Sequence, residues 1–358
     1  MLEIRNLTTE PEATEGVDPR TIEFGRDNSP NFFVMDYSDG QWRNARIEPV
    51  QPFVLHPAAN VLHYAQTIFE GLKAYRQPSG SIALFRPNLN AARFHRSARR
   101  MSIPAVEEGA FLDAVSALVT NERNLVPPEP GCLYVRPSII GVEPSVGLKS
   151  SNAFTFFILT YPSGPYFGHA GEGAGSIDVL VSTSVTRACQ GGMGNVKAGA
   201  NYAGTLAILE RAKELGCAQV LFLDAVGHRG VEEMGGMNLI FLQNGALRTP
   251  PLSETILDGV TRDSVLAIAE DFGLGVEEEF ISIDELVAGL RDGSVTEAIA
   301  CGTAAVTTGI KTFRFEDGSV VPVGTVCPGP VTSQLYERLV GIQYGLLPDP
   351  HGWVHPVV

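Results

Sequence analysis

The stretch GGMGNVKAGANYAGTL (191–206) sets a single lysine, Lys197, among residues with very small side chains. Its first fourteen residues hold five glycines and three alanines. An ordinary solvated lysine needs no such surroundings, whereas small neighbours allow a flat group to lie against the backbone. A lysine that forms a Schiff base needs a packed, partly desolvated pocket, because a permanently protonated amine cannot react. The stretch therefore indicates a reactive lysine, and Tyr202 follows closely enough to fold back toward it.

Two further segments of the second half carry groups that could serve such a lysine. VEEMGGMN (231–238) presents two adjacent glutamates, which point in opposite directions if the segment is extended. LDGVTRDSVL (257–266) contains the start of a helix, with Thr261 as its expected N-cap, where free backbone N–H groups and the helix dipole favour an anion. A reactive lysine, a carboxylate on a strand and a helix start suited to phosphate are the parts that a pyridoxal phosphate (PLP) site needs.

The length of the chain, 358 residues, favours two domains. The segment 163–176 is rich in glycine and proline and shows no periodicity, which is typical of a linker. We therefore predict an N-terminal domain over 1–162 and a C-terminal domain over 177–358. Both halves mix strands with helices, and the first thirty residues, which are polar, are expected to form an arm or a loose strand.

Periodicity and turn signals place the expected elements. Strands are predicted at 81–87, 132–141, 153–161, 177–183, 219–224 and 238–243, and a hairpin at 32–42 with its turn at Ser38–Gly40. Helices are predicted at 88–104, 109–122, 201–216, 261–273, 283–293 and 331–345. Residues 60–76 begin with helical periodicity and end as a strand.

Charge and cysteine content exclude several classes of protein. The net charge of −14, from 26 basic and 40 acidic residues, argues against a nucleic-acid partner, because nucleic-acid binding needs a basic surface. The five cysteines are odd in number and include no CxxC pair, and a disulfide scaffold is not expected in a chain of this length, which favours a reducing cytoplasm. The N-terminus has no apolar signal core, and the longest apolar run, around 153–161, is too short to span a bilayer. We expect a soluble cytoplasmic protein with no membrane partner.

The motifs GNVKAGANYAG, EEMGGMN, DGVTR and CGTAA occur together and in this order. In this combination the sequence resembles the branched-chain-amino-acid aminotransferases of the fold type IV group of PLP enzymes, with matching motifs from Tyr64 to Thr303 and family-like sequence on either side. The resemblance implies a two-domain α/β (α+β) fold like that of the D-amino-acid aminotransferases, with a smaller N-terminal and a larger C-terminal PLP-binding domain. It also implies a reversible ping-pong transfer of the amino group of L-leucine, L-isoleucine or L-valine to 2-oxoglutarate, which gives L-glutamate.

The resemblance assigns the cofactor chemistry to three residues. Lys197 would carry PLP as a Schiff base and then move the proton between the substrate and the cofactor. Tyr202 would donate a hydrogen bond to the phenolate oxygen. Glu233, rather than Glu232, would pair with the pyridine nitrogen and keep it protonated, because a neighbouring carboxylate raises the pKa of that nitrogen and the protonated ring is the electron sink.

The resemblance also assigns the phosphate ligands. They are the side chain of Arg93, within NLNAARFHRSARR (88–100), and the backbone N–H groups and hydroxyls at Val260, Thr261 and Thr303. Leu257 and Gly259 would pack near the ring and the phosphate. Three further arginines of the same helix compete with Arg93 on spacing alone, and helical arginines are normally solvated; they are Arg96, Arg99 and Arg100.

The implied substrate pocket draws on several motifs. The aromatic residues Tyr64 and Phe69 would form an apolar wall, and Tyr134 and Arg136, which share one face of a strand, would receive a carboxylate. The remaining expected contacts are Tyr166 of the linker, Gly236, and the turn at Thr303 and Ala304. Leu, Ile and Val differ by about a methylene, worth roughly 1–3 kcal/mol, so all three should be accepted.

Other readings stay open at this level. The protein could be another fold type IV enzyme: a D-amino-acid aminotransferase, an R-selective amine aminotransferase or an aminodeoxychorismate lyase. It could also be a non-catalytic PLP-binding protein. Such a protein could lose Lys197 or Glu233 freely, however, and both residues are present. The resemblance further implies a homodimer, with 141–151 as the loop that reaches the partner's pocket, and no metal.

Overall fold

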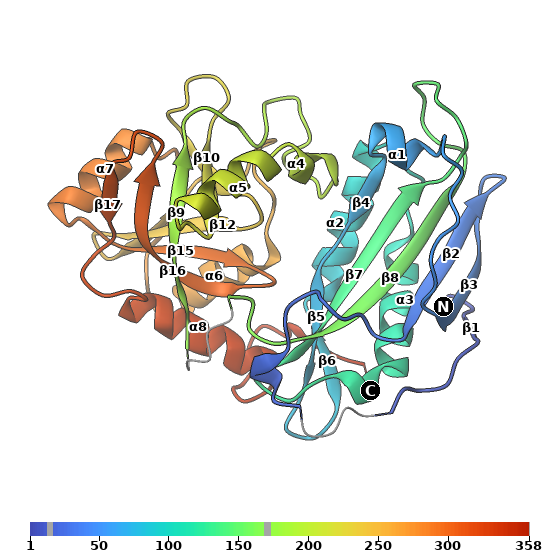
Figure 1. Cartoon of the computed structure of the whole chain (residues 1–358). Coiled ribbons are helices and arrows are strands. Elements are labelled where there is room, and N and C mark those ends of the chain that lie inside the picture. Colours follow the sequence, from blue (N-terminus) through green and yellow to red (C-terminus); the bar gives the residue numbers. More distant parts are fainter. Residues whose placement is uncertain (13–16, 168–172, 358) are drawn as a thin grey trace. The chain divides into compact units, whose positions relative to one another are not determined.

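The computed structural model describes residues 1–12, 17–167 and 173–357 (Figure 1). Within the predicted linker 163–176, residues 168–172 lie outside this described part. The chain divides into two compact units, which are described separately. Unit 1 comprises Met1–Ala170, Val196–Ala200 and Gly341–Val358, and unit 2 comprises Gly171–Asn195 and Asn201–Val340. Two segments of the predicted C-terminal domain thus belong to unit 1, and one of them carries Lys197.

Unit 1 is built on a nine-stranded sheet in the order β1-β3-β2-β8-β7-β5-β6-β18, with β4 paired to β7. All of its pairs are antiparallel except β1 with β3. The strands are β1 (Arg5–Asn6), β2 (Asn31–Ser38), β3 (Gln41–Pro49), β4 (Thr67–Phe69), β5 (Leu72–Arg76), β6 (Ile82–Phe85), β7 (Cys132–Gly141), β8 (Phe154–Ser163) and β18 (Val354–Pro356). The short helices are η1 (Pro19–Thr21), α1 (Asn60–Tyr64) and η2 (Arg123–Leu125).

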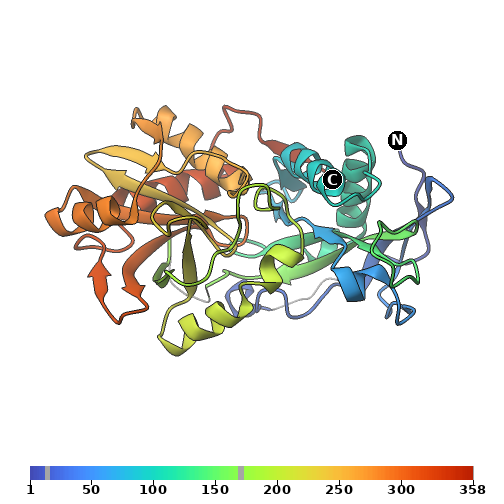
Figure 2. The same cartoon turned by 90° about the horizontal axis from the view of Figure 1, so that it is seen from above.

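Two long helices, α2 (Pro87–Arg100) and α3 (Glu108–Asn121), cover one face of this sheet and lie side by side (Figure 2). Because side chains alternate along a strand, Leu133 and Val135 of β7 enter the core beneath the helices. Their neighbours Tyr134 and Arg136 must then lie on the opposite face. Burial of the core aromatic side chains stabilises the unit by roughly 1.5–3 kcal/mol each. The helices therefore do not cover the second face of the sheet, which carries Tyr134 and Arg136.

Unit 2 contains a second nine-stranded sheet in the order β11-β10-β9-β16-β15-β12-β13-β14, with β17 paired to β16. Its strands are β9 (Ser176–Ser182), β10 (Gln219–Leu223), β11 (Val231–Met234), β12 (Asn238–Gln243), β13 (Ala246–Thr249), β14 (Val276–Glu278), β15 (Val295–Gly302), β16 (Val306–Phe315) and β17 (Val320–Pro322). The helices are α4 (Ala200–Ala203), α5 (Leu206–Glu214), α6 (Val260–Asp271), α7 (Ile283–Asp292) and α8 (Pro330–Gln343). Helix α5 packs against β9 and β10 through Ile208, Leu180 and Phe222.

Most of the expected elements are present, two expectations need correction, and some strands were missed. The predicted helix 201–216 consists of α4 and α5, with Gly204 and Thr205 between them. The N-cap of α6 is Gly259, so the prediction of Thr261 as N-cap is wrong; Thr261 lies inside the first turn. The strands β15 and β16 were not anticipated. None of the helices in the described part of the chain combines the length and the apolarity that crossing a bilayer requires.

Candidate functional site

The segment that carries Lys197 is fixed in unit 1 by backbone pairing with β4. The N–H of Phe69 donates to the Lys197 carbonyl (3.0 Å), and the N–H of Gly199 donates to the Thr67 carbonyl (3.2 Å). The N–H of Lys197 donates to the hydroxyl of Ser97 on α2 (3.0 Å). Because both sides of the backbone are held, the position at which the Lys197 side chain starts is well defined.

The ring of Phe69 lies next to two cationic groups. The Nζ of Lys197 lies 5.2 Å from the ring centroid, and the Cζ of Arg136 lies 4.8 Å from it. The Nη2 of Arg136 donates to the Tyr134 hydroxyl (3.0 Å), so the prediction that Tyr134 and Arg136 share a face is confirmed. Unit 1 therefore brings the predicted reactive amine and the predicted carboxylate-binding pair together around the ring of Phe69, one of the two predicted wall residues.

Burial distinguishes Arg93 from the other arginines of α2. Arg93 is only 3% exposed, whereas the three competing arginines, Arg96, Arg99 and Arg100, are exposed. Arg93 forms a two-point ion pair with Glu70, with Nε to Oε1 at 2.6 Å and Nη2 to Oε2 at 2.9 Å. The sequence did not single out Glu70, because a glutamate in a turn between two short strands is by itself an ordinary surface residue.

Two aromatic residues at the edge of this group behave differently. The ring of Tyr166 is 37% exposed and lies 4.9 Å from the ring of Phe24, which in turn lies 4.7 Å from that of Tyr134. Phe24 was missed because the N-terminal residues read as a loose arm. In the part of the chain that the structure describes, Tyr64 has other partners: its hydroxyl donates to the Val146 carbonyl, and its ring is tilted against that of His63, with the centroids 6.3 Å apart.

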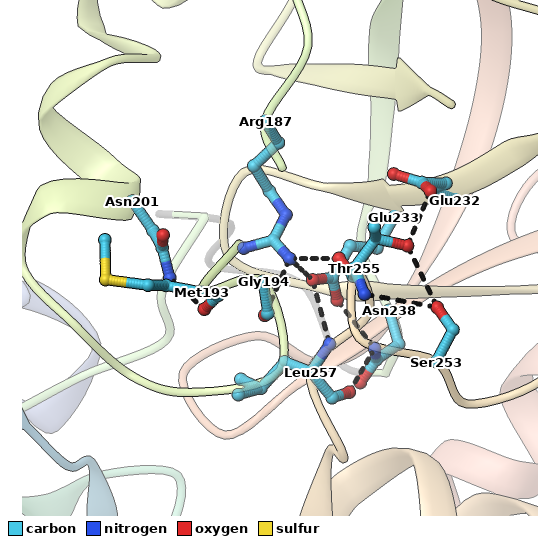
Figure 3. A network of polar contacts seen from close by, with 10 residues as sticks. All are labelled: Arg187, Met193, Gly194, Asn201, Glu232, Glu233, Asn238, Ser253, Thr255 and Leu257. Atoms are coloured by element: carbon cyan, nitrogen blue, oxygen red, sulfur yellow. Dashed lines mark hydrogen bonds and ion pairs between the residues drawn. The ribbon is translucent and has the colours of Figure 1, made fainter. Parts of the chain in front are cut away.

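In unit 2, Glu233 on β11 accepts hydrogen bonds from three directions (Figure 3). The Leu257 N–H donates to Oε1 (3.0 Å), the Asn238 Nδ2 donates to Oε2 (2.8 Å), and Arg187 forms an ion pair with Oε1. The side chains of Arg187 and Glu233 are each only 4% exposed. Three donors of this kind stabilise the ionised carboxylate, which is the form that can pair with a protonated ring nitrogen.

The neighbouring glutamate, Glu232, has a different partner. Its Oε1 accepts a hydrogen bond from the Thr255 hydroxyl (2.6 Å), as expected for a side chain that points away from its neighbour on a strand. Burial raises the pKa of the Glu232 carboxyl, and the Thr255 hydrogen bond and the charge of Arg187 only partly offset this. Burial thus favours the neutral form of Glu232, whereas the charged Arg187 and two further donors surround the Glu233 carboxylate, which favours Glu233 as the residue that faces a cation.

Arg187 connects three parts of unit 2. Besides Glu233, its Nη2 donates to the carbonyl of Gly194 (2.8 Å) and to that of Thr255. It thereby links β11 to the loop that leads toward Lys197 and to the loop that precedes α6 (Figure 3). Nothing in the sequence identifies Arg187, because it stands ten residues before the lysine in a segment without periodicity.

Leu257, Gly259 and the start of α6 lie beside Glu233. The Asn238 Nδ2 also donates to the Leu257 carbonyl (2.9 Å), and a Cβ at Gly259 would lie 1.9 Å from the Asn238 Oδ1. A side chain at position 259 would therefore displace the Asn238 amide, which bonds to Glu233 and Leu257. The N-cap residue of α6 is Gly259, so the N-cap position supplies no side-chain acceptor to the first turn, which contains Val260 and Thr261.

The turn after β15 lies next to the glycine pair of VEEMGGMN. A Cβ at Gly302 would lie 3.3 Å from the Gly236 carbonyl, so Gly236 and the turn that carries Thr303 and Ala304 are neighbours. Nothing lies within 4 Å of a Cβ built at Gly236, which leaves open space on that side. Tyr202 is half-buried on α4, and its carbonyl accepts hydrogen bonds from Thr205.

The glycines around Lys197 have structural causes other than the approach of a flat ligand. A Cβ at Gly194 would lie 2.5 Å from the Thr255 Cα, and one at Gly199 would lie 2.8 Å from the Thr67 Cγ2. Gly191 adopts a positive φ of 75°. Close packing against the protein's own chain and one tight turn therefore account for most of them, and only Gly204 has open space with no strained conformation.

The residues present fit PLP. In unit 1, the buried Arg93 suits a phosphate and the lysine held at its backbone suits the aldehyde. In unit 2, the start of α6 suits a phosphate and the three-donor carboxylate of Glu233 suits a pyridine nitrogen. Among the described residues, no cluster of His, Cys, Asp and Glu could hold a metal ion. All five cysteines are unpaired, and Cys301 is fully buried with its pKa raised to about 12 by burial.

Comparison with known proteins gives a consistent result. The profile of the amino-transferase class IV family matches residues 67–313. The chain is 42% identical to branched-chain-amino-acid transaminase 1 of Bacillus subtilis, over 95% of both chains. It is 43% identical to the branched-chain-amino-acid aminotransferase of Mycobacterium tuberculosis, over 92% of this chain and 91% of the relative.

Solved structures agree. The PLP form of the branched-chain amino acid aminotransferase of Thermobaculum terrenum matches with a TM-score of 0.74 at 25% identity, over 93% of this chain and 100% of that one. The enzyme of Thermoproteus uzoniensis, solved with norvaline, matches with a TM-score of 0.73 at 26% identity, over 91% and 100% of the two chains. By profile, sequence and structure, this chain belongs to the class IV aminotransferases and, within them, to the branched-chain-amino-acid aminotransferases.

Proposed function

We propose that the protein transfers the amino group of L-leucine, L-isoleucine or L-valine to 2-oxoglutarate, reversibly and in two half-reactions, with PLP bound covalently to Lys197. The products are the branched 2-oxo acid and L-glutamate. The relatives named for this reaction support the proposal, as does the structure of the related enzyme with norvaline, an unbranched analogue of such substrates.

One observation of this chain carries the proposal: the Phe69 ring, with the Lys197 amine at 5.2 Å and the Arg136 guanidinium at 4.8 Å. An amino acid has an α-carbon that must meet the reactive amine and, in glutamate, a second carboxylate that needs a cation. Arg136, with the Tyr134 hydroxyl as its hydrogen-bond partner, can receive that carboxylate. Phe69 can contact an apolar side chain at the same place, so one site can serve both substrates.

The chain's own residues divide the remaining work. PLP supplies an electron sink for the negative charge that develops at the substrate α-carbon. Glu233 holds a proton at the ring nitrogen, and Lys197 takes and returns the α-proton as general base and acid. Arg93, Val260, Thr261 and Thr303 would bind the phosphate, and Tyr202 would donate a hydrogen bond to the phenolate oxygen.

Further contacts complete the proposed site. Leu257 and Gly259 pack against the ring and phosphate, while Gly236 and the turn at Thr303 and Ala304 offer backbone groups to the α-carboxylate. Tyr64 and Tyr166 contribute to the substrate wall.

We propose that the protein is a cytoplasmic homodimer in which 141–151 reaches the partner's site. This loop exposes two apolar side chains close together, Val146 and Leu148, which are 64% and 88% exposed and are available for contact with a partner subunit. The five unpaired cysteines fit a reducing compartment. The test is the mass of the native protein in solution, where a monomer at micromolar concentration would contradict the proposal.

The test of the reaction is spectroscopic and kinetic. PLP-loaded protein should show a visible absorbance band that L-leucine bleaches and 2-oxoglutarate restores, and L-leucine, L-isoleucine and L-valine should all support steady turnover. Bleaching by D-alanine but not by L-leucine would instead identify a D-amino-acid aminotransferase. Binding of PLP with no bleaching by any amino acid or amine would leave a non-catalytic PLP-binding protein.

A further inference from the structure

Glu70 is a fully buried carboxylate directly after Phe69, at the turn between β4 and β5. A buried carboxylate is costly unless donors replace its water. Besides the two bonds from Arg93, Oε2 accepts one from the Asn90 Nδ2 (2.8 Å) and one from the Gly71 N–H (3.1 Å). Four donors on two oxygens nearly saturate the carboxylate, so Glu70 cannot rotate without losing several bonds at once.

The two bonds to Arg93 fix an orientation as well as a contact. They use Nε and Nη2, which lie along one edge of the planar guanidinium. Because the group is rigid, holding one edge at two points fixes the directions of all five N–H groups. The direction in which Arg93 presents donors to an external phosphate is therefore set by Glu70.

The charges of Arg93 and Lys197 both act on the Glu70 carboxylate. Burial alone would raise the pKa of the Glu70 carboxyl, but the Arg93 guanidinium, the Lys197 amine and the hydrogen bond from Asn90 hold it below its usual value. Ser97 ties the same elements together, since its hydroxyl donates to the Arg93 carbonyl (2.9 Å) and accepts from the Lys197 N–H. Glu70 thus remains an anion beside both predicted cofactor ligands of unit 1.

A purely structural role explains this arrangement less well. A buried ion pair adds little net stability, and a well-packed apolar pair of similar volume is often as stable or more so. Burying the Glu70 carboxylate costs desolvation energy. This cost is explained if the arginine that it holds also binds a ligand. That arginine, Arg93, is the one proposed to bind phosphate.

We propose that Glu70 is a positioning residue, which aligns the Arg93 guanidinium with the PLP phosphate and thereby sets the affinity for that phosphate group. The inference rests on the proposed function, since it requires that Arg93 binds PLP. It predicts that Glu70 matters for PLP but not for pyridoxal, which has the same ring and aldehyde and lacks the phosphate.

The test compares the dissociation constants of PLP and of pyridoxal for the full-length protein stripped of its cofactor, by absorbance or tryptophan fluorescence. Glu70→Gln should weaken PLP binding about tenfold to a hundredfold, the range found when an outer partner of a metal ligand is removed, and change pyridoxal binding less than threefold. Glu122→Gln is the matched control. Glu122 is also fully buried in unit 1, but its partners are Asn31 and Asn121, so its substitution should change neither constant.

Four outcomes overturn the inference: an equal loss for PLP and pyridoxal, tighter PLP binding by Glu70→Gln, no change, or a loss as large with Glu122→Gln. In an Arg93→Gln background, Glu70→Gln should add no further loss of PLP affinity, and an additive loss also contradicts it. If Glu70→Gln does not fold, Asn90→Ala should show the same selective loss for PLP, smaller in size. Failure of the wild-type protein to bind PLP at all would instead reject the proposed function.

Discussion

Two buried arginine–carboxylate pairs stand at the predicted cofactor ligands, one in each unit, and they are arranged in opposite senses. In unit 1 the predicted ligand is the cation, Arg93, and Glu70 supports it. In unit 2 the predicted ligand is the anion, Glu233, and Arg187 supports it. Each pair is nearly inaccessible, with side-chain exposures of 4% or less.

The difference shows what each supporting residue must do. Glu70 contacts Arg93 at two points, so it controls the orientation of a flat donor. Arg187 shares its Nη2 among Glu233 and two carbonyls, so it links three segments of chain rather than fixing one plane. Removing the first support should affect ligand geometry, whereas removing the second should loosen several loops together.

The largest expected effect comes from removing Lys197, the proposed covalent attachment point of PLP. Lys197→Ala should lower kcat for L-leucine by about 10⁴-fold or more, because loss of a covalent catalytic group is of this size in other enzymes. The measurement is single-turnover reaction of L-leucine with PLP-loaded protein. Full turnover by Lys197→Ala would reject the mechanism. The two pairs could then not be compared as supports of cofactor ligands.

The pair in unit 2 is tested by substituting Glu233, the residue expected to bind PLP. Glu233→Gln should lower kcat by about 10²–10³-fold, as loss of a preorganised electrostatic group does, because a neutral amide cannot hold the ring nitrogen protonated. Glu232→Gln is the matched control and should stay within about threefold of the wild type, since burial already favours the neutral form of Glu232. A larger effect at Glu232 than at Glu233 would reverse the assignment.

The two pairs are compared directly by removing each arginine. Arg93→Met and Arg187→Met both leave a buried carboxylate without its cation, so each should lower the free energy of unfolding by about 3–5 kcal/mol. Urea unfolding of the cofactor-free proteins measures this loss. Only Arg93→Met should also weaken PLP relative to pyridoxal. Equal selectivity changes in the two variants would show that the pairs do not differ in the proposed way.

The smallest effect is expected at a carboxylate that is held by backbone N–H groups instead of an arginine. Asp224, in the turn before β11, accepts four backbone N–H groups. Burial opposes its ionisation, but these hydrogen bonds lower its pKa from 3.8 to about 2. A depressed pKa stabilises the fold above the unfolded-state pKa, and this stabilisation is lost as pH falls from about 4 through about 2.

Asp224→Asn should therefore lower the urea midpoint slightly at pH 6, and the difference from wild type should narrow as pH falls toward 2. The expected effect is small because Asp224 is largely solvated and its charge is screened. A difference that widens on acidification would contradict the role of the ionised carboxylate.

The sequence identified the groups expected to meet a ligand better than the groups that support them. Lys197 and Glu233 stand in distinctive motifs, and the alternation along 132–141 correctly placed Tyr134 and Arg136 together. Arg93 needed the resemblance, because its helix offers four arginines, and the structure separates them by burial.

Glu70, Arg187 and Phe24 could not be found in the same way. Each acts on a residue distant in the chain: Glu70 on Arg93, Arg187 on Glu233, and Phe24 on Tyr134. Local periodicity carries no information on such pairs. The strands β15 and β16 were missed for a related reason, since their pairing with β12 and β9 across the sheet decides their conformation.

The composition of unit 1 has a consequence for the order in which the chain can fold. Its sheet includes β18, Val354–Pro356, which pairs with β6, and the Lys197 segment is attached to β4 by an isolated bridge between Ala198 and Ile68. During synthesis the first 162 residues emerge without either of these pieces. A fragment cut between 162 and 177 would have an unprotected sheet edge at β6, which is a template for aggregation. The unit whose residues are synthesised first can thus be completed only after the C-terminal residues have been synthesised.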